Sequence, residues 1–415
     1  MNTRDHCLAL DARDPLAPLR DQFVLPAGVI YLDGNSLGAL PAAAPERIAQ
    51  VVREEWGHDL IRSWNSAGWI HLPQRVGDKI ARLIGARPGE VVAADSTSVN
   101  LYKVLNVALA LAGGRRVIVS ERSNFPTDLY IAEELLRARG GELLLLEHDQ
   151  IGPRLRQGDV AVLMLTQVNY RTGRLLDMAA LTAAAHANGT LTVWDLAHSA
   201  GALRVDLHAA NADFAIGCGY KYLNGGPGAP AFVWVHPRHV DRLPQPLAGW
   251  MGHASGFHFA PGYAPAAGIT RYLCGTPPVI GMAALECGVD TLLAAEPLGG
   301  IAALRAKSLA LTDLFLRLVE QRCAGHSLVN ITPTEHAHRG SQVCLTRAEG
   351  AYALVQALIA RGVIGDFRAP DVLRFGFTPL YLRFVDVWNA VEHLHKVLAS
   401  GEWKDARFNQ RSAVT

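Results

Sequence analysis

The sequence predicts an α/β protein: a large domain on a mainly parallel sheet, followed by a smaller C-terminal α+β domain. Strand-like and helix-like segments alternate from about residue 45 to residue 280, and the strand-like ones are almost continuously apolar. Such strands are covered on both faces. After about residue 285 the pattern changes to a long helix and short strand-like pieces. We therefore expect an N-terminal segment packing with the small domain (1–45), a large domain (46–285) and a small domain (286–415).

The helices are expected in regular alternation along the large domain. Residues 43–57, AAPERIAQVVREEWG, are amphipathic. Three further helices are expected at 98–114, 127–141 and 178–189, and each runs into a closing glycine, which readily takes the left-handed conformation after a last helical turn. The long apolar stretch at 297–323 opens the small domain as a helix.

The strands are short, apolar runs between these helices. They are expected at residues 115–121, 141–147, 160–168, 191–197, 214–217 and 231–235. Ligands of parallel sheets bind beyond the carboxyl ends of the strands. The residues that follow each strand are therefore the candidates for a functional site.

Composition excludes several classes of protein. Half of the 415 residues are hydrophobic, which argues against disorder, and 39 Lys and Arg balance 38 Asp and Glu without a long basic run. We therefore expect no nucleic-acid partner. The first residues carry charges where a signal peptide needs an apolar core, and no apolar run is long enough to span a membrane. Six scattered cysteines without a CxxC pair indicate reduced thiols in a cytoplasmic protein.

Polar and aromatic side chains gather just after the predicted strands. Asp195 closes one strand, His198 follows it, and Lys221 lies past the next strand. Phe125 follows an earlier strand, and Thr97 with Ser98 opens a helix. Taken singly, each has an ordinary explanation: a solvated lysine, a helix N-cap or a carboxylate that caps the next helix.

Together these residues suit one cofactor. Pyridoxal phosphate needs a lysine for its aldehyde and a carboxylate at its ring nitrogen. It also needs a flat side chain against the ring, a part that Phe125 or His198 could play, and a helix N-terminus with hydroxyls for the phosphate. The chain supplies these groups in the expected order.

Other site types are not indicated. The sequence has no P-loop, no complete dinucleotide fingerprint, no HExxH and no GxSxG at the lysine turn. His336 and His338 form a weak potential chelate, but an exposed loop explains them better, so we expect no metal.

The motifs resemble those of one family over nearly the whole chain. The segments are YLDGNSLGALP (31–41), NFPTD (124–128), WDLAHSAG (194–201), GCGYKYLNGGPG (217–228), GWMGH (249–253) and RFGFTPLY (374–381). In order and spacing they resemble the kynureninase family, which are pyridoxal-phosphate enzymes of fold type I in the aminotransferase superfamily. The resemblance implies hydrolysis of L-kynurenine to anthranilate and L-alanine, in tryptophan catabolism, NAD biosynthesis or both.

The resemblance also implies roles for particular residues. Lys221 would form the Schiff base and move the Cα proton, Asp195 would pair with the pyridine N–H, and Phe125 would stack on the ring. Tyr220 would bind the phosphate and is our candidate for relaying a proton to the substrate carbonyl. The remaining expected cofactor contacts are Thr97, Ser98, Asp128, Thr166, His198, Trp250 and Thr276.

Some of these contacts are expected from a second copy of the chain. In the family that it resembles, Trp250 and the segment CGTPP (274–278) reach the cofactor of the partner subunit, which implies a homodimer with shared active sites. Arg374 matches the arginine that binds the substrate α-carboxylate, a task that suits its planar, bidentate geometry.

Substrate preference is expected from the residues around the aryl group. Family members that prefer 3-hydroxykynurenine resemble each other in having His, Ser and Asn there, and the matching residues here are Trp64, Gly275 and Thr276. A site that lacks polar partners for the 3-hydroxyl has no reason to favour it, so we expect a preference for kynurenine. Trp64 also fits a core anchor, as does Trp69. Asn35 fits either a substrate contact or a positive-φ turn position.

Two other functions remain open on the sequence alone. A cysteine desulfurase or an aminotransferase would use the same fold, although Cys323 and Cys344 do not lie in the Gly/Ser-rich loop that a desulfurase thiol needs. A non-catalytic, cofactor-binding module would be free to lose Lys221, Asp195 or Arg374, and this chain keeps all three.

Overall fold

The large domain is built around one seven-stranded sheet. The computed structural model describes residues 3–259 and 261–411. The strand order is β4-β10-β9-β8-β7-β5-β6. The strands are β4 Val91–Ala93, β5 Val117–Glu121, β6 Glu142–Leu146, β7 Val160–Thr166, β8 Leu191–Asp195, β9 Phe214–Gly217 and β10 Phe232–Val235.

The sheet is mainly parallel, as predicted, but it is mixed. β6, β5, β7, β8 and β9 run parallel, whereas β10 is antiparallel to both β9 and β4. Most parallel neighbours are separated in the chain by helices, which carry the chain back across the sheet. β9 and β10 are joined by the glycine-rich connection, which brings β10 back beside β9 in the opposite direction.

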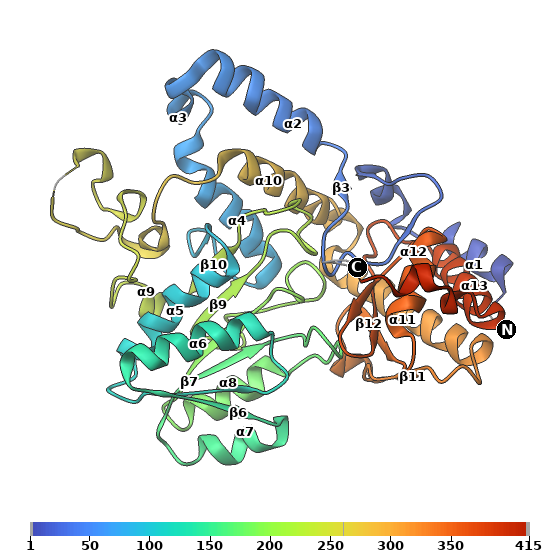
Figure 1. The fold of residues 1–415 in the computed structure, drawn as a ribbon. Coiled ribbons are helices and arrows are strands. Elements are labelled where there is room, and N and C mark those ends of the chain that lie inside the picture. Colours follow the sequence, from blue (N-terminus) through green and yellow to red (C-terminus); the bar gives the residue numbers. More distant parts are fainter. Residues whose placement is uncertain (1–2, 260, 412–415) are drawn as a thin grey trace.

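Helices cover the sheet, as Figure 1 shows, and some of them were predicted. The expected helices at 98–114, 127–141, 178–189 and 297–323 correspond to α5 Thr97–Leu111, α6 Pro126–Arg139, α8 Met178–His186 and α11 Gly300–Arg322. The structure adds α3 Ser63–Ser66, α4 Leu72–Ile84, α7 His148–Leu155, α9 Pro237–Val240 and α10 Val279–Leu293.

The first predicted helix has a different form. Residues 43–57 were expected as one amphipathic helix, but α2 Ala44–Gln50 continues as a π-helix over Val51–Asp59. The apolar pattern does not separate the two helix types over so few residues. In Figure 1 this arm projects away from the sheet at the top of the view, together with α3.

The C-terminal part has its own antiparallel sheet. Its strands follow the order β11-β12-β15-β14. They are β11 Val329–Asn330, β12 Gln342–Thr346, β14 Asp366–Arg368 and β15 Val372–Gly376, packed with α11, α12 Ala351–Ala360 and α13 Phe384–Ser400.

The N-terminal segment contacts this C-terminal part. Asp11, in α1 Arg4–Asp11, accepts hydrogen bonds from the backbone N–H groups of Phe384 and Val385 at the start of α13. β2 Ile30–Tyr31 pairs in parallel with β13 Val363–Ile364, while β1 Phe23–Val24 pairs with β3 Leu40–Pro41. These contacts fit the expected packing, and the domain boundaries stay a prediction.

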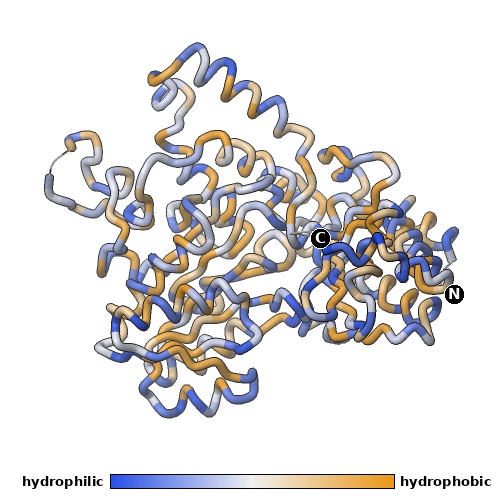
Figure 2. Tube along the Cα trace, viewed as in Figure 1, coloured by the Kyte–Doolittle hydropathy of each residue, from blue (hydrophilic) through white to orange (hydrophobic). Residues whose placement is uncertain are grey.

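The strands of the large sheet form the most continuous hydrophobic part of the chain, as Figure 2 shows. Trp194, Phe214, Phe232 and Trp234 are completely or almost completely buried there. In the part of the chain that the structure describes, no helix has the length and apolarity needed to cross a bilayer.

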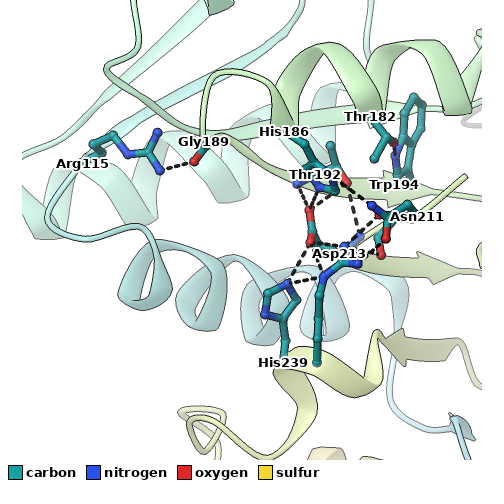
Figure 3. Close-up of polar contacts among 11 residues, drawn as sticks. Arg115, Thr182, His186, Gly189, Thr192, Trp194, Asn211, Asp213 and His239 are labelled. Atoms are coloured by element: carbon teal, nitrogen blue, oxygen red, sulfur yellow. Dashed lines mark hydrogen bonds and ion pairs between the residues drawn. The ribbon is translucent and has the colours of Figure 1, made fainter.

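A buried carboxylate ties the strands together at the edge opposite Asp195. Asp213, directly before β9, accepts a hydrogen bond from the Thr192 backbone and contacts His186, His239 and Arg238 (Figure 3). Burial alone would raise the pKa of Asp213, but these hydrogen bonds outweigh it and hold the pKa far below its ordinary value. This cluster therefore stabilises the fold rather than leaving a group free for a ligand.

Candidate functional site

A cavity of about 290 Å³ lies at the carboxyl ends of β7, β8 and β9. It brings together nine of the residues predicted from the sequence, although they are spread over more than a hundred positions. The lining residues are Thr97, Ser98, Phe125, Thr127, Asp128, Thr166, Tyr170, Asp195, Ala197, His198, Cys218, Tyr220 and Lys221. The first turns of α5 and α6 close its sides.

Lys221 is held by a histidine of fixed tautomer. Its Nζ lies 2.9 Å from Nε2 of His198, and Nδ1 of His198 lies 2.9 Å from Oε1 of Gln342. The Gln342 amide donates to the carbonyls of Asn169 and Tyr170, so its oxygen faces the ring. His198 therefore donates through Nδ1 and accepts from Lys221 through Nε2. Burial and the charge of Lys221 lower the pKa of His198 well below its ordinary value, which keeps it neutral.

Asp195 presents a carboxylate to the cavity, beside Asp128, with which it shares a hydrogen bond. Its Oδ1 accepts a hydrogen bond of 2.8 Å from the backbone N–H of Ala197. The Thr166 hydroxyl lies 3.4 Å from Oδ2 but donates at closer range to Asn124. Oδ2 of Asp195 thus keeps the capacity to accept a hydrogen bond from a ring N–H.

A second buried carboxyl, Asp128, lies beside the first. Burial and the negative charge of Asp195 raise the pKa of Asp128 well above its ordinary value, which favours its protonated form. Its Oδ2 is buried and has no hydrogen-bond partner within the described residues. A buried polar atom of this kind is costly unless a ligand satisfies it. A flat ring with polar substituents in this cavity fits that requirement.

The N-terminus of α5 provides the anion site. Ser96 is the N-cap, and its hydroxyl accepts from the Val99 N–H. The ordinary explanation for Thr97 and Ser98, that one of them caps the helix, is therefore wrong. Both hydroxyls line the cavity, where free N–H groups and the helix dipole favour a phosphate.

Phe125 and Tyr220 flank the lysine. Lys221 Nζ lies 5.7 Å from the centre of the Phe125 ring and 5.9 Å from that of Tyr220. Phe125 is 38% exposed, lines the cavity and makes a T-shaped contact with Tyr170, with 5.3 Å between the ring centres. Burial raises the pKa of Tyr220 to about 12, so the phenol is protonated at neutral pH and can donate.

Two predicted substrate residues lie behind this cavity. Arg374 on β15 is 1% exposed and does not line it, but donates to the carbonyl of Tyr170, which does. Asn35 is completely buried and its amide has no hydrogen-bond partner among the described residues. Because Asn35 does not have a positive φ, the explanation of it as a left-handed turn residue is wrong.

Four other predicted site residues lie elsewhere in the same chain. Trp64 and Trp250 meet edge-on at 5.7 Å, in an aromatic cluster with Trp69, and none of the three is fully buried. Gly275 and Thr276 are exposed. None of these four lines the cavity around Lys221.

Sequence reasoning missed the residues that hold the site in place. Gln342 fixes His198, Asn124 holds Thr166, and Asp366 with Ser36 holds Arg374. Ser36 lies within one of the quoted motifs, which was the only signal available for it. Gln342 and Asp366 come from strands of the C-terminal sheet and carry no local pattern.

The thiols are poorly placed for catalysis. Cys218, Cys323 and Cys344 are buried, and burial raises the pKa of each. Across residues 3–259 and 261–411, no cluster of His, Cys, Asp and Glu is suited to a metal. His336 and His338 lie in an exposed short turn, where they contact Asp313 and Glu335.

The chain is similar to known proteins along its whole length. A family model described as the kynureninase C-terminal domain matches residues 304–394. Proteins named kynureninase from Pseudomonas fluorescens and Burkholderia pseudomallei (strain 1106a) are 58% and 55% identical, with full coverage of both chains.

Among solved structures, the similarity is one of fold. A cysteine desulfurase from Thermococcus onnurineus NA1 has a TM-score of 0.79 at 17% identity, and covers 92% of this chain and 98% of its own. A C-DES mutant with glycine covalently linked to its PLP cofactor has a TM-score of 0.76 at 17% identity, covering 92% of this chain and 98% of its own.

Proposed function

The chain belongs to the kynureninase family, and we propose that its cavity at Lys221 hydrolyses L-kynurenine to anthranilate and L-alanine. It is a hydrolase of carbon–carbon bonds in ketonic substances, and it uses pyridoxal phosphate. One observation carries the assignment of the site. Lys221 and Asp195, on neighbouring strand ends, face one cavity that also holds an unsatisfied buried carboxyl and a helix N-terminus.

The residues present fit this cofactor. When bound, pyridoxal phosphate supplies an aldehyde for amines and an electron-withdrawing ring. Asp195 would hold the ring nitrogen, Thr97 and Ser98 the phosphate, and Phe125 the ring face. Neutral His198 accepts from Lys221 and orients its amino group toward the cavity.

Proton movement is assigned to two neighbouring side chains. Lys221 removes the proton from the substrate Cα, because it is the lysine that lines the cavity. The substrate bond between Cβ and Cγ breaks after water adds to the γ-carbonyl. That addition needs a proton donor near the carbonyl oxygen, and Tyr220 is protonated at neutral pH and lines the same cavity.

We expect Tyr220→Phe to lower kcat by about 10²- to 10³-fold, as loss of a general acid does. The dissociation constant of pyridoxal phosphate, measured by absorbance titration, should rise by less than about 10-fold, because only one phosphate contact is lost. Comparable losses in turnover and in cofactor affinity would show that Tyr220 only holds the phosphate.

We propose that kynurenine is preferred over 3-hydroxykynurenine. Support comes from the residues matched to the aryl site, Trp64, Gly275 and Thr276, which offer few polar partners for a 3-hydroxyl. We expect kcat/KM for kynurenine to be at least about 10-fold higher, because a hydroxyl loses its hydrogen bonds to water in such a site. Parallel assays with the two substrates test this, and a higher value for 3-hydroxykynurenine would contradict it.

We also propose a homodimer in which each copy completes the site of the other. Trp250 and Thr276 do not line the cavity of their own chain. Large apolar side chains are exposed in the segments around Trp64 and Trp250, among them Trp56 at 59%, Ile61 at 76% and Phe259 at 73%. Exposed apolar surface of this kind marks an interaction site.

Sedimentation velocity tests the dimer. The unsubstituted protein should sediment as a dimer, and Ile61→Asp should weaken the dimer at least about 10-fold, with a parallel loss of activity, because it places a charge in the apolar contact. Val329→Asp is the control, since Val329 is a similarly exposed aliphatic residue on the C-terminal sheet. A fully active monomer would refute shared sites.

The desulfurase alternative is not favoured. The solved structures of similar fold include desulfurases, but the thiols that the sequence offered in the C-terminal part, Cys323 and Cys344, are buried. Burial raises their pKa values and disfavours the reactive thiolate. Tryptophan catabolism and NAD biosynthesis in the cytoplasm both suit the proposed reaction.

A further inference from the structure

Four of the five N–H groups of Arg374 already donate to protein atoms. It lies opposite Asp366 on the neighbouring strand, and its Nε and Nη2 both donate to that carboxylate, with Nε at 2.8 Å. Nη2 also donates to the Ser36 hydroxyl at 2.7 Å, and Nη1 donates to the Tyr170 carbonyl at 2.9 Å. A substrate carboxylate would therefore meet a guanidinium that already has a carboxylate partner.

The charges at this position do not favour an anion if Arg374 acts alone. Arg374 and Asp366 together carry no net charge. The nearby Asp33 adds almost none at pH 7, because burial and the negative charge of Asp366 raise the pKa of Asp33 to about 8. Attraction of a carboxylate thus requires one more positive group.

Arg368 is that group. Its Nη2 donates to Asp366 at 2.7 Å and to Ser36 at 3.2 Å, so the two arginines share one carboxylate and one hydroxyl. Its Nε is buried without a hydrogen-bond partner in the described part of the chain, while the side chain as a whole is 38% exposed. Burial and the positive charge of Arg374 lower the pKa of Arg368. A bound anion would stabilise the charge of Arg368 and could accept a hydrogen bond from its Nε.

The charge of Arg368 also reaches the cofactor cavity. Burial raises the pKa of Tyr220, and Arg368 opposes that rise. For His198, Arg368 adds to the lowering of the pKa by burial and by Lys221. The contacts agree with this: Arg374, which shares Asp366 and Ser36 with Arg368, donates to the carbonyl of Tyr170, and Tyr170 lines the cavity.

We propose that Arg368 is a second substrate-binding arginine, which shares the α-carboxylate of the amino-acid substrate with Arg374. Asp366 and Ser36 are positioning residues that set the two guanidinium groups side by side. The inference rests on the proposed function, since it assumes a substrate that carries an α-carboxylate. It extends that function by assigning the net positive charge of the carboxylate site to Arg368.

The test compares ligands with and without the carboxylate. Arg368→Gln should raise KM for kynurenine by about 10- to 100-fold, the usual loss for a charge-assisted hydrogen bond, with a change in kcat below about 5-fold. The inhibition constant of kynuramine, which is kynurenine without its α-carboxylate, should change by less than about 3-fold. Arg368→Lys keeps the positive charge and loses the planar, bidentate geometry, so its KM for kynurenine should lie between those of the unsubstituted protein and Arg368→Gln.

Arg361→Gln is the matched control, because Arg361 is a partly exposed arginine of the C-terminal part that pairs with Glu402. It should leave both constants unchanged. If Arg368→Gln does not fold, the same comparison of KM for kynurenine with the inhibition constant of kynuramine is made on Arg368→Lys. An equal change in KM for kynurenine and in the inhibition constant of kynuramine, or no change in either, would overturn the proposal.

A binding measurement separates this inference from the proposed function. The affinity of the cofactor-loaded protein for L-alanine, followed by absorbance, needs no turnover, and Arg368→Gln should weaken it by about 10-fold or more. If the unsubstituted protein does not hydrolyse kynurenine but this loss is found, the proposed function fails and Arg368 still binds an α-carboxylate. Unchanged L-alanine affinity in an active enzyme overturns the role of Arg368 alone.

Discussion

Replacing Lys221 by alanine is expected to reduce kcat/KM for kynurenine by at least about 10⁴-fold. The same amino group is assigned to attachment of the cofactor and to removal of the Cα proton, and loss of an acid–base group alone accounts for about 10²- to 10⁴-fold. Among the described residues that line the cavity, no other lysine is present to replace Lys221. Anthranilate fluorescence measures the activity.

The control for this variant is Lys396→Ala, a loss of an exposed lysine on α13. It should keep full activity and the yellow colour of the bound cofactor. Borohydride reduction followed by peptide mass analysis should place the cofactor on Lys221 in the unsubstituted protein. More than about one hundredth of the original activity in Lys221→Ala would show that another group removes the proton.

Replacing Asp195 by asparagine is expected to lower kcat/KM by about 10³-fold. Ala197 donates a hydrogen bond to Asp195, and Oδ2 remains able to accept, so this carboxylate is placed to hold a protonated ring nitrogen. Breaking a buried charge pair costs about 3–5 kcal/mol, which corresponds to a loss of this order.

Asp128→Asn gives the matched comparison in the same cavity. Burial and the charge of Asp195 raise the pKa of Asp128 and so favour its neutral form. Replacing it by the neutral amide should therefore lower kcat/KM by less than about 10-fold. Steady-state kinetics of the two variants, with cofactor content checked by absorbance, measures the difference. Equal losses in both would contradict the charge assignment.

The fold of the large domain was largely predictable because apolar strands and helices alternate along the sequence. Apolar runs separated by helices predict a parallel sheet, and the carboxyl ends of such strands meet at one edge. That reasoning alone placed Asp195, His198 and Lys221 together. It did not predict that β10 returns antiparallel, since the orientation depends on the path of the connection rather than on the strand's composition.

The contacts that hold the site could not be predicted in the same way. His198 and Gln342 are 144 positions apart and meet only because the C-terminal sheet packs against the large domain. Arg374 was expected to bind the substrate carboxylate, but its pairing with Asp366, which strand register places directly opposite, was not expected. Register between two strands depends on the whole sheet and leaves no local trace in the sequence.

The residues proposed to complete the site of a second copy are harder still to place. Trp64, Trp250, Gly275 and Thr276 have no contact with the cavity of their own chain, so neither local pattern nor the fold of one chain identifies their partners. Their roles came from the family resemblance and stay predictions.

The central claim is tested most directly by product release from L-kynurenine, with and without added pyridoxal phosphate. The purified protein should form anthranilate and L-alanine in equal amounts, and removal of the cofactor should abolish both, with recovery when it is added back. A protein that binds the cofactor on Lys221 but forms no anthranilate, or that instead releases sulfur from cysteine, would contradict the account.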